Sequence, residues 1–282
     1  MQAANGFYTH GYAPVVTAHH GKRTAEKFAG HVVKILKRGD EVLDVGCGPG
    51  SITSGFCKYV GPKGRIVGVD SSESVLEEAR ARPEVVSGAA VVDFRKGDGT
   101  ALDFPSNSFD VVHAHQVLQH VTTPVEILKE MRRVARGPGG VVAVREVDFG
   151  TWTWYPEDPV LDEYLKVYRA VCVHNGGQPC AGRRLPAWFR EAGFSPEFLS
   201  VSSDAVTYFG AEECASLAET WARRVLESGI ATKAVAYGLA SQEDLQRFAD
   251  AWRRWGAAPD AHVFYIDTCV TGRVEGSSER GK

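Results

Sequence analysis

Acidic and histidine side chains stand at the ends of successive apolar runs in this chain. Asp70 closes one such run, Asp98 follows the run 90–95, and His115 follows the run 109–114. A carboxylate in such a place can accept hydrogen bonds from sugar hydroxyl groups, and an imidazole can accept or donate a proton. The spacing therefore indicates a ligand site, provided that the fold brings these strand ends together.

A glycine-rich turn closes the first apolar run, which reads Val42-Leu43-Asp44-Val45-Gly46-Cys47-Gly48-Pro49-Gly50. Glycine lacks a Cβ and tolerates positive φ, so a ligand can approach the backbone closely there. Two ligand classes fit such a turn: nicotinamide dinucleotides and S-adenosylmethionine. A dinucleotide fingerprint has the spacing Gly-x-Gly-x-x-Gly, with the pyrophosphate at the start of a helix. This turn has the spacing Gly-x-Gly-x-Gly, and the carboxylate of Asp44 would repel a pyrophosphate but suit a ligand with an ammonium and a sulfonium group.

Alternating strand and helix patterns would place these residues. Apolar runs separated by helical stripes predict a parallel sheet with helices on both faces, and such sheets bind ligands at the carboxyl ends of their strands. Thr123 and Glu126 around Pro124 predict a capping box at the start of one helix. The predicted strands are 41–45, 65–69, 90–95, 109–114 and 140–147, and the helices lie near 51–60, 72–82 and 124–136.

Two amphipathic helix patterns near the end of the chain predict a cap. Apolar residues fall on one face of each pattern, and Ser241 with Asp244 predicts an N-terminal cap for the second. No linker rich in Pro, Gly or Ser separates them from the rest, so they are interpreted as a helical insertion at about 209–260 within a domain that spans 41–282. The helices in this half are predicted at 158–173, 183–192, 212–228 and 241–256, and strands within 194–208 and 262–270.

The sequence pattern of residues 1–40 predicts an N-terminal helical lid. An apolar stripe predicts a helix near 24–36, and the segment before it carries several aromatic and histidine side chains. That segment could pack on the edge of the sheet, or it could fold over a ligand in the glycine turn. Tyr12 and Arg23 are the best candidates for contacts from a lid.

Composition narrows the classes of partner. Lys and Arg total 32 and Asp and Glu total 35, giving a net charge of −3, and no basic tract exceeds two residues, which disfavours a nucleic-acid partner. Arginine pairs such as Arg223-Arg224 are interpreted as solvated helix faces. The six cysteines lack metal-site spacing and are expected to be reduced, mostly buried thiols. No apolar run approaches the ~20 residues of a membrane span, and the first residues lack the apolar core of a signal peptide, so a cytoplasmic protein is expected.

The glycine turn and the strand ends together resemble a known family, the class I S-adenosylmethionine-dependent methyltransferases. The turn is similar to their motif I, and a later segment is similar to motif IV of the UbiE-like small-molecule branch. The resemblance implies a Rossmann-like, doubly wound, mostly parallel seven-stranded sheet with an antiparallel last strand and a helical cap. The matching segments are 42–50, 68–70, 97–99, 109–120 and 132–140; over 150–270 only the layout matches.

The resemblance also implies a set of cofactor contacts. Asp70 would bind the ribose hydroxyls and Asp98 would meet the adenine amino group, with S-adenosylmethionine as cofactor and S-adenosylhomocysteine as product. The expected cofactor-binding residues are Tyr12, Arg23, Asp44, Gly46, Cys47, Gly48, Asp70, Ser71, Gly97, Asp98, Gly99, His115 and Gln116.

The expected reaction transfers a methyl group to an O, N, C or S atom of a small-molecule acceptor. Because the sulfonium methyl is already activated, the protein mainly has to align the acceptor and exclude water. A base is needed only if the acceptor must lose a proton, and His115 and His120 are the candidate catalytic residues nearest to the methyl group. Trp152, Trp154 and Tyr155 form either a wall of the acceptor pocket or part of the core under the cap.

Several alternatives remain open at this level. An NAD(P)-dependent oxidoreductase would bind NAD instead, and a regulatory protein with the same fold would bind the cofactor without turnover. A nucleic-acid methyltransferase is disfavoured because 113–116 reads His-Ala-His-Gln, where base-methylating relatives carry Asn/Asp-Pro-Pro-aromatic. Glu146 and Asp148 could hold a divalent metal, but no third ligand has a convincing spacing, so no metal is expected. Neither the acceptor nor the oligomeric state follows from the sequence.

Overall fold

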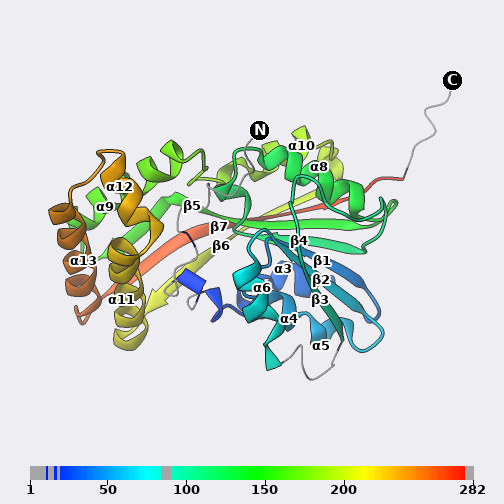
Figure 1. The fold of residues 1–282 in the computed structure, drawn as a ribbon, viewed down its shortest axis with the longest axis horizontal. Coiled ribbons are helices and arrows are strands. Elements are labelled where there is room, and N and C mark those ends of the chain that lie inside the picture. Colours follow the sequence, from blue (N-terminus) through cyan, green and yellow to red (C-terminus); the bar gives the residue numbers. More distant parts are fainter. Residues whose placement is uncertain (1–10, 12–15, 18–19, 84–89, 277–282) are drawn as a thin grey trace.

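One seven-stranded sheet organises the fold (Figure 1). The structure is a computed structural model, and it describes residues 11, 16–17, 20–83 and 90–276. The strand order is β3-β2-β1-β4-β5-β7-β6, with β7 antiparallel to both of its neighbours and the pairs from β3 to β5 parallel, which confirms the predicted fold class. The strands are β1 Glu41–Val45, β2 Arg65–Asp70, β3 Val91–Lys96, β4 Val111–His115, β5 Val141–Tyr155, β6 Leu199–Phe209 and β7 His262–Arg273.

Helices cover both faces of the sheet because successive residues of each central strand point to opposite sides. Val42 and Ile66 belong to the core under α2 to α5, whereas Leu43 and Val67 belong to the core under α8 and α10. Both side chains of each pair are fully buried, which explains why these strands appear in the sequence as continuous apolar runs. The helices are α2 Ala25–Phe28, α3 Gly30–Val33, α4 Ser51–Gly55, α5 Cys57–Val60, α6 Glu73–Arg80, α8 Pro124–Val134 and α10 Leu185–Glu191.

Four helices form a cap at the far end of the long strands β5 to β7 (Figure 1). Its core contains Trp221 and Trp252, whose rings stack with centroids 5.8 Å apart. The cap includes α9, which lies outside the predicted insertion at 209–260, and α12, which was not predicted. The capping box of Ser241 and Asp244 is present, as predicted. The cap helices are α9 Pro159–His174, α11 Ala211–Glu227, α12 Gly229–Ala236 and α13 Gln242–Gly256.

Several local predictions were wrong. The helix predicted near 24–36 is broken at Ala29, whose φ of −133° and ψ of 29° leave the helical region, and the helix predicted at 51–60 is divided at Phe56. Thr123 makes no side-chain hydrogen bond to the start of α8, so the predicted capping box is absent, although Pro124 does occupy the first turn. Thr123 has a ψ of 59°, far from the extended backbone that an N-cap residue usually adopts.

Strand β5 is longer than predicted and carries the sheet into the cap. After an irregularity between Asp148 and Thr153, its last residues pair with β7, with Trp154 opposite Val263. All six cysteines are free thiols, and five of them are buried, which confirms that part of the prediction. In the part of the chain that the structure describes, no helix is both long and apolar enough to cross a membrane.

Candidate active site

The glycine turn after β1 forms the floor of a large cavity. Gly46, Gly48 and Gly50 have φ values of 70°, 52° and 71°, so each lies in the region that disfavours residues with a side chain. A Cβ on Gly46 would lie 2.4 Å from the Val117 side chain, whereas a Cβ on Gly48 would meet no protein atom within 4 Å. The backbone at Gly48 is therefore bare toward the cavity, which leaves room for a ligand against the main chain.

Asp70 ends β2 beside this turn. Its Oδ2 accepts a hydrogen bond from the Gly48 N–H at 3.0 Å, and its Oδ1 accepts one from the Ser72 N–H at 3.0 Å. Burial raises the pKa of the Asp70 carboxyl, because desolvation outweighs these backbone hydrogen bonds. The structure thus places a desolvated carboxylate, fixed by two N–H groups, on the cavity wall where the resemblance implied a ribose contact.

Asp44 lies deeper, at the end of β1. It is 3% exposed, and its Oδ2 accepts a hydrogen bond from the Thr53 hydroxyl at 2.5 Å while its Oδ1 lies 2.8 Å from Nδ1 of His113. Both carboxylate oxygens therefore already have protein partners. Asp44 borders the cavity, but it is almost fully buried beneath the turn, so it supports the turn from below and contributes negative potential.

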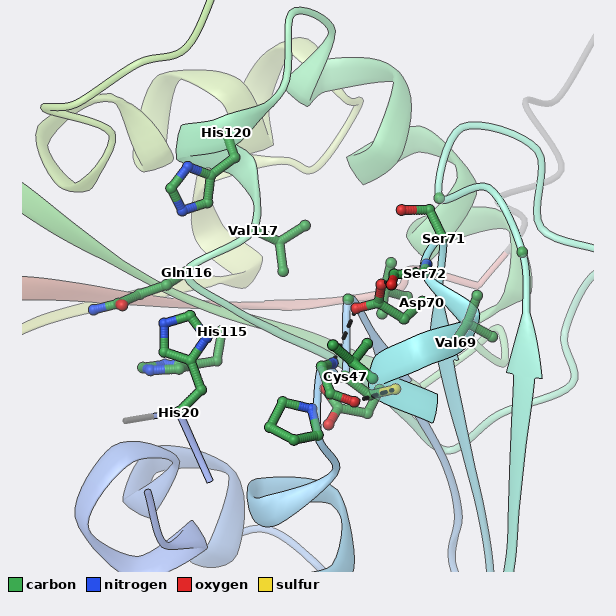
Figure 2. A pocket seen from close by; sticks show the side chains of 18 of the residues that line it. His20, Cys47, Val69, Asp70, Ser71, Ser72, His115, Gln116, Val117 and His120 are labelled. Carbon is green, nitrogen blue, oxygen red and sulfur yellow. Dashed lines mark hydrogen bonds between the residues drawn. The ribbon is translucent and has the colours of Figure 1, made fainter. Parts of the chain in front are cut away.

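His115, Gln116 and Arg23 form the opposite wall, as Figure 2 shows for the first two. His115 is 8% exposed, and neither ring nitrogen has a hydrogen-bond partner among the described residues. Burial and the positive charges of Arg23 and Arg145 lower the pKa of His115 well below its usual range, so the imidazole is neutral at pH 7. Gln116 accepts a hydrogen bond from Nη2 of Arg23 at 2.6 Å, which ties the N-terminal segment to the end of β4.

His120 lies in a 3-10 turn, η1 Leu118–His120, that lines the same cavity. Burial, together with the positive charges of Arg23, Arg224 and Lys233, lowers the pKa of His120 to about 3. A base with so low a pKa is poorly matched to proton removal near neutral pH. The environment of His120 therefore favours hydrogen bonding to a ligand over general base catalysis.

Glu146 holds this turn in place, a role that the sequence did not suggest. Its side chain is fully buried, and Oε1 accepts hydrogen bonds from the N–H groups of Val117 and Leu118 at 2.8 and 2.6 Å. Both N–H groups precede His120 in the chain. Glu146 thus connects β5 to the segment that carries Gln116 and His120.

We expect the stability of the protein to depend on the ionisation of Glu146. Burial raises its pKa from 4.5 to about 8, so between these values the folded protein holds a proton that the unfolded chain releases. The free energy of unfolding then falls as pH rises through this window, by at most about 1.4 kcal/mol per pH unit. Glu146→Gln keeps an oxygen acceptor but cannot ionise, so denaturant unfolding at about pH 5.5 and about pH 7.5 should show a weaker pH dependence. Equal pH dependence in the variant and the wild type would contradict this assignment.

Asp148, considered with Glu146 as a metal ligand, does not line the cavity. Its carboxylate pairs with the Arg183 guanidinium, with Oδ1 accepting a hydrogen bond from Nη2 at 2.9 Å and Oδ2 accepting one from Nε. Burial raises the pKa of Asp148, but the hydrogen bonds from Arg183 and the Gly150 N–H together outweigh it and lower the pKa below its usual value. Both carboxylates therefore have partners within the protein. Among the described residues, no group of three or more His, Cys, Asp or Glu side chains is arranged to hold a metal ion.

The cavity has a volume of roughly 980 Å³ and lies at the carboxyl ends of the parallel strands, where such sheets bind ligands. In Figure 2, Asp70, Ser71 and Ser72 lie on one side of it, and His115, Gln116 and His120 lie on the other. The described part of the N-terminal segment closes it through Thr17, His20 and Arg23, and the Ser51 hydroxyl donates a hydrogen bond to the His20 carbonyl at 2.9 Å. His20 and Ser51 were not among the predicted site residues, since neither belongs to a motif.

The structure brings nearly all of the predicted site residues to this cavity. Tyr12 lies outside the described residues. Cys47 borders the cavity with a thiol whose pKa burial raises well above its usual value, so it is a protonated, packed side chain. Asp98 lies on an exposed loop, where its Oδ1 accepts hydrogen bonds from the N–H and hydroxyl of Thr100. The predicted residues that line the cavity are Arg23, Asp44, Gly46, Cys47, Gly48, Asp70, Ser71, Gly97, Asp98, Gly99, His115, Gln116 and His120.

The three predicted aromatic residues after β5 have different environments. Trp152 lines a small recess beside the main cavity, Trp154 is buried in the cap core, and Tyr155 is 59% exposed. Only Trp152 can therefore form part of a pocket wall.

The fold and the cavity define an α/β protein with a nucleotide-type site at the carboxyl edge of its sheet. A family model described as a methyltransferase domain matches residues 36–193. An uncharacterized methyltransferase of Schizosaccharomyces pombe is 35% identical over 275 residues, covering 95% of this chain and 97% of the relative. A 2-phytyl-1,4-naphtoquinone methyltransferase of Synechococcus elongatus is 32% identical over 57% of this chain and 64% of its own length. The crystal structure of the YcgJ protein of Bacillus subtilis superposes with a TM-score of 0.57 at 19% identity, over 92% of this chain and 100% of that one.

The chain belongs to the class I S-adenosylmethionine-dependent methyltransferases. The family match covers the glycine turn, Asp70, Asp98 and the His115 segment, and the relative from S. pombe extends the likeness through the cap. The resemblance to motif I is thereby confirmed, and the protein is an enzyme of this family.

Proposed function

We propose that this protein binds S-adenosylmethionine in the large cavity and methylates an O, N, C or S atom of a small molecule that enters beside His120. The main support is the arrangement of the cavity, which has a bare glycine turn and Asp70 at one end and a polar wall that includes the buried His115 at the other. A volume of roughly 980 Å³ falls in the range of natural ligand sites. The relative named for a naphthoquinone acceptor also supports a small-molecule substrate.

The residues present fit this cofactor. Gly48 leaves space for a ligand against the backbone, and the Asp70 carboxylate offers acceptors to the ribose hydroxyls. The ring nitrogens of His115, which have no hydrogen-bond partner among the described residues, lie at the opposite end with the guanidinium of Arg23, where the amino-acid part of the cofactor would be held. When bound, the cofactor supplies an activated methyl group, whose bond to sulfur breaks as the bond to the acceptor forms, with the electron pair remaining on sulfur.

The protein then contributes mainly position and exclusion of water. The N-terminal segment closes the cavity through the hydrogen bond between Arg23 and Gln116, and Glu146 fixes the turn that carries His120. Because both His115 and His120 are neutral at pH 7, they can orient polar groups without placing an additional positive charge beside a sulfonium. This arrangement suits an acceptor that attacks without prior proton removal by the protein.

Calorimetric titration tests the cofactor assignment. We expect S-adenosylhomocysteine to bind at one site and NAD to show no measurable binding under the same conditions. The opposite result would establish the oxidoreductase alternative and overturn the proposal. Binding of S-adenosylhomocysteine without turnover of S-adenosylmethionine across a broad acceptor panel would favour a regulatory protein that keeps the fold.

A further inference from the structure

The sheet ends in a long edge strand, β6 (Figure 1). Among the strands that the structure describes, β6 pairs only with β7, so the N–H and C=O groups along its other side have no strand beside them. It has 11 residues, whereas strands in globular proteins usually have about five or six. An edge strand of this length is a ready template for pairing with another chain.

The β6 edge lacks most of the features that usually prevent such pairing. Edge strands are commonly protected by Lys or Pro residues, by bulges or by short length. Leu199–Phe209 contains no Lys, Arg, Pro or Gly, and it keeps one register with β7 along its whole length. Its one charged residue is Asp204, whose Oδ2 lies 3.6 Å from Nη1 of Arg145 in the same sheet. The edge is therefore open to pairing, and its single carboxylate already has a counter-ion.

Apolar side chains lie on the face of this edge that the cap does not cover. Successive residues of a strand point to opposite faces, and Val206 packs in the cap core with 5% exposure. Val201 and Phe209 therefore lie on the other face, where they are 51% and 71% exposed. On the same face of β7, Phe264 is 38% exposed. Apolar groups gathered in this way indicate a contact surface more strongly than single exposed residues do.

The exposed side chains of β6 match one another when the strand is reversed. If two copies of β6 lie antiparallel about a two-fold axis at Ala205, residues at equal distances from Ala205 face each other. Val201 of one copy then faces Phe209 of the other, and Ser203 faces Thr207. Pairs of a β-branched with an aromatic side chain, and of Ser with Thr, are favourable across antiparallel strands. The edge is thus complementary to a second copy of itself.

The two neighbouring registers lose this match. An axis at Asp204 would place two carboxylates directly opposite each other, which is destabilising. An axis at Val206 would place Phe209 opposite Ser203, so the aromatic ring would lose its apolar partner. The axis at Ala205 avoids both problems, because it places Asp204 of one copy opposite Val206 of the other.

We propose that two copies of this chain associate through antiparallel pairing of their β6 strands about a two-fold axis at Ala205, which joins their sheets edge to edge. A second copy is the occupant because the edge complements itself, and a two-fold contact of this kind forms a closed dimer. A charged partner would find no counter-charge on β6, because Asp204 is already paired with Arg145. The inference concerns the assembly of the chain and does not rest on the proposed function.

Sedimentation velocity of the wild-type protein tests whether the dimer forms. Between roughly 1 and 200 µM, we expect the mass to rise from that of a monomer to that of a dimer. No larger species should follow, because a two-fold contact closes on itself. A monomer over the whole range, or growth beyond the dimer, would overturn the proposal.

Two variants at Ala205 test the position of the axis. Ala205→Lys and Ala205→Glu each place two like charges opposite each other, so each should raise the dissociation constant of the dimer by about tenfold or more. Ala205 is exposed, so both proteins should fold, and thermal melting checks this. An equimolar mixture of the two should dimerise again, because a Lys then faces a Glu. Wild-type dimerisation of either variant alone, or no recovery in the mixture, would refute the axis at Ala205.

Val91→Lys and Val91→Glu provide the matched control. Val91 is 59% exposed on β3, the strand at the opposite edge of the sheet. These variants change the net charge by the same amounts and should dimerise like the wild type, alone and mixed. Equal loss of the dimer in Val91→Lys and Ala205→Lys would show that net charge, and not the β6 edge, controls association. None of these measurements requires a cofactor, so the result is independent of whether S-adenosylhomocysteine binds.

Discussion

Asp70→Ala is expected to weaken the binding of S-adenosylhomocysteine by roughly 10-fold to 100-fold. The carboxylate is the acidic group that borders the cavity beside the bare backbone of Gly48, and hydrogen bonds to a charged group contribute about 1.5–3 kcal/mol each. A loss of about 1.4 kcal/mol corresponds to a tenfold change in affinity. The variant also loses the acceptor that orients the Gly48 N–H, so the turn itself becomes less ordered. Calorimetry with S-adenosylhomocysteine measures the effect directly.

Asp93→Ala provides a matched control for this change. Asp93 lies on the neighbouring strand β3, pairs with Arg95 through a 2.6 Å contact, and does not line the cavity. Both variants remove one carboxylate, so their difference isolates the position of Asp70. We expect the unliganded Asp70→Ala protein to melt within a few degrees of the wild type, because the buried carboxylate is held at a desolvation cost. If Asp70→Ala bound S-adenosylhomocysteine with wild-type affinity, the ribose would have to be held by other residues.

The strands and the glycine turn could be predicted because their determinants are local. Val42 and Leu43 are apolar for different reasons, one for each face of the sheet, but together they produce the continuous run that defines a buried parallel strand. The glycines at 46, 48 and 50 likewise reflect backbone angles at their own positions. Asp70 could be placed because a parallel sheet aligns the carboxyl ends of its strands.

The parts that were not predicted depend on partners far away in the chain. The end of β5 contains Gly150 and two threonines, and it forms a strand where its last three residues pair with β7. Glu146 and Asp44 appeared to be ligand or metal carboxylates, but Oε1 of Glu146 accepts a hydrogen bond from the Val117 N–H and Oδ1 of Asp44 contacts His113, so both carboxylates have partners inside the protein. The same applies to Arg224, since an arginine on an amphipathic helix is solvated by default and only the packing of the cap buries it.

A buried ion pair between β5 and β7 connects the sheet to the N-terminal cover. Nε of Arg145 donates a hydrogen bond to Oδ2 of Asp267 at 2.8 Å, with side-chain exposures of 5% and 0%. Nη1 of Arg145 also donates to the carbonyl of Lys27 in α2 at 3.3 Å. Burial raises the pKa of Asp267 in spite of this partner, so desolvation is the larger effect at that carboxyl. Burying the pair therefore costs desolvation free energy, and removing one partner costs more because it leaves the other charge buried without compensation.

Asp267→Ala is therefore expected to lower the free energy of unfolding by about 3–5 kcal/mol, because it leaves the Arg145 charge buried without its closest acid. Asp204→Ala removes the second acid near the same guanidinium, at 3.6 Å, but Asp204 is 56% exposed, and its loss should cost less than about 1 kcal/mol. Replacing both members of the buried pair, as in Arg145→Met/Asp267→Val, should restore part of the stability that Asp267→Ala loses, since no unpaired charge remains. Denaturant unfolding of the four proteins measures these differences. A double variant that is no more stable than Asp267→Ala would show that lost packing, and not the isolated charge, accounts for the loss.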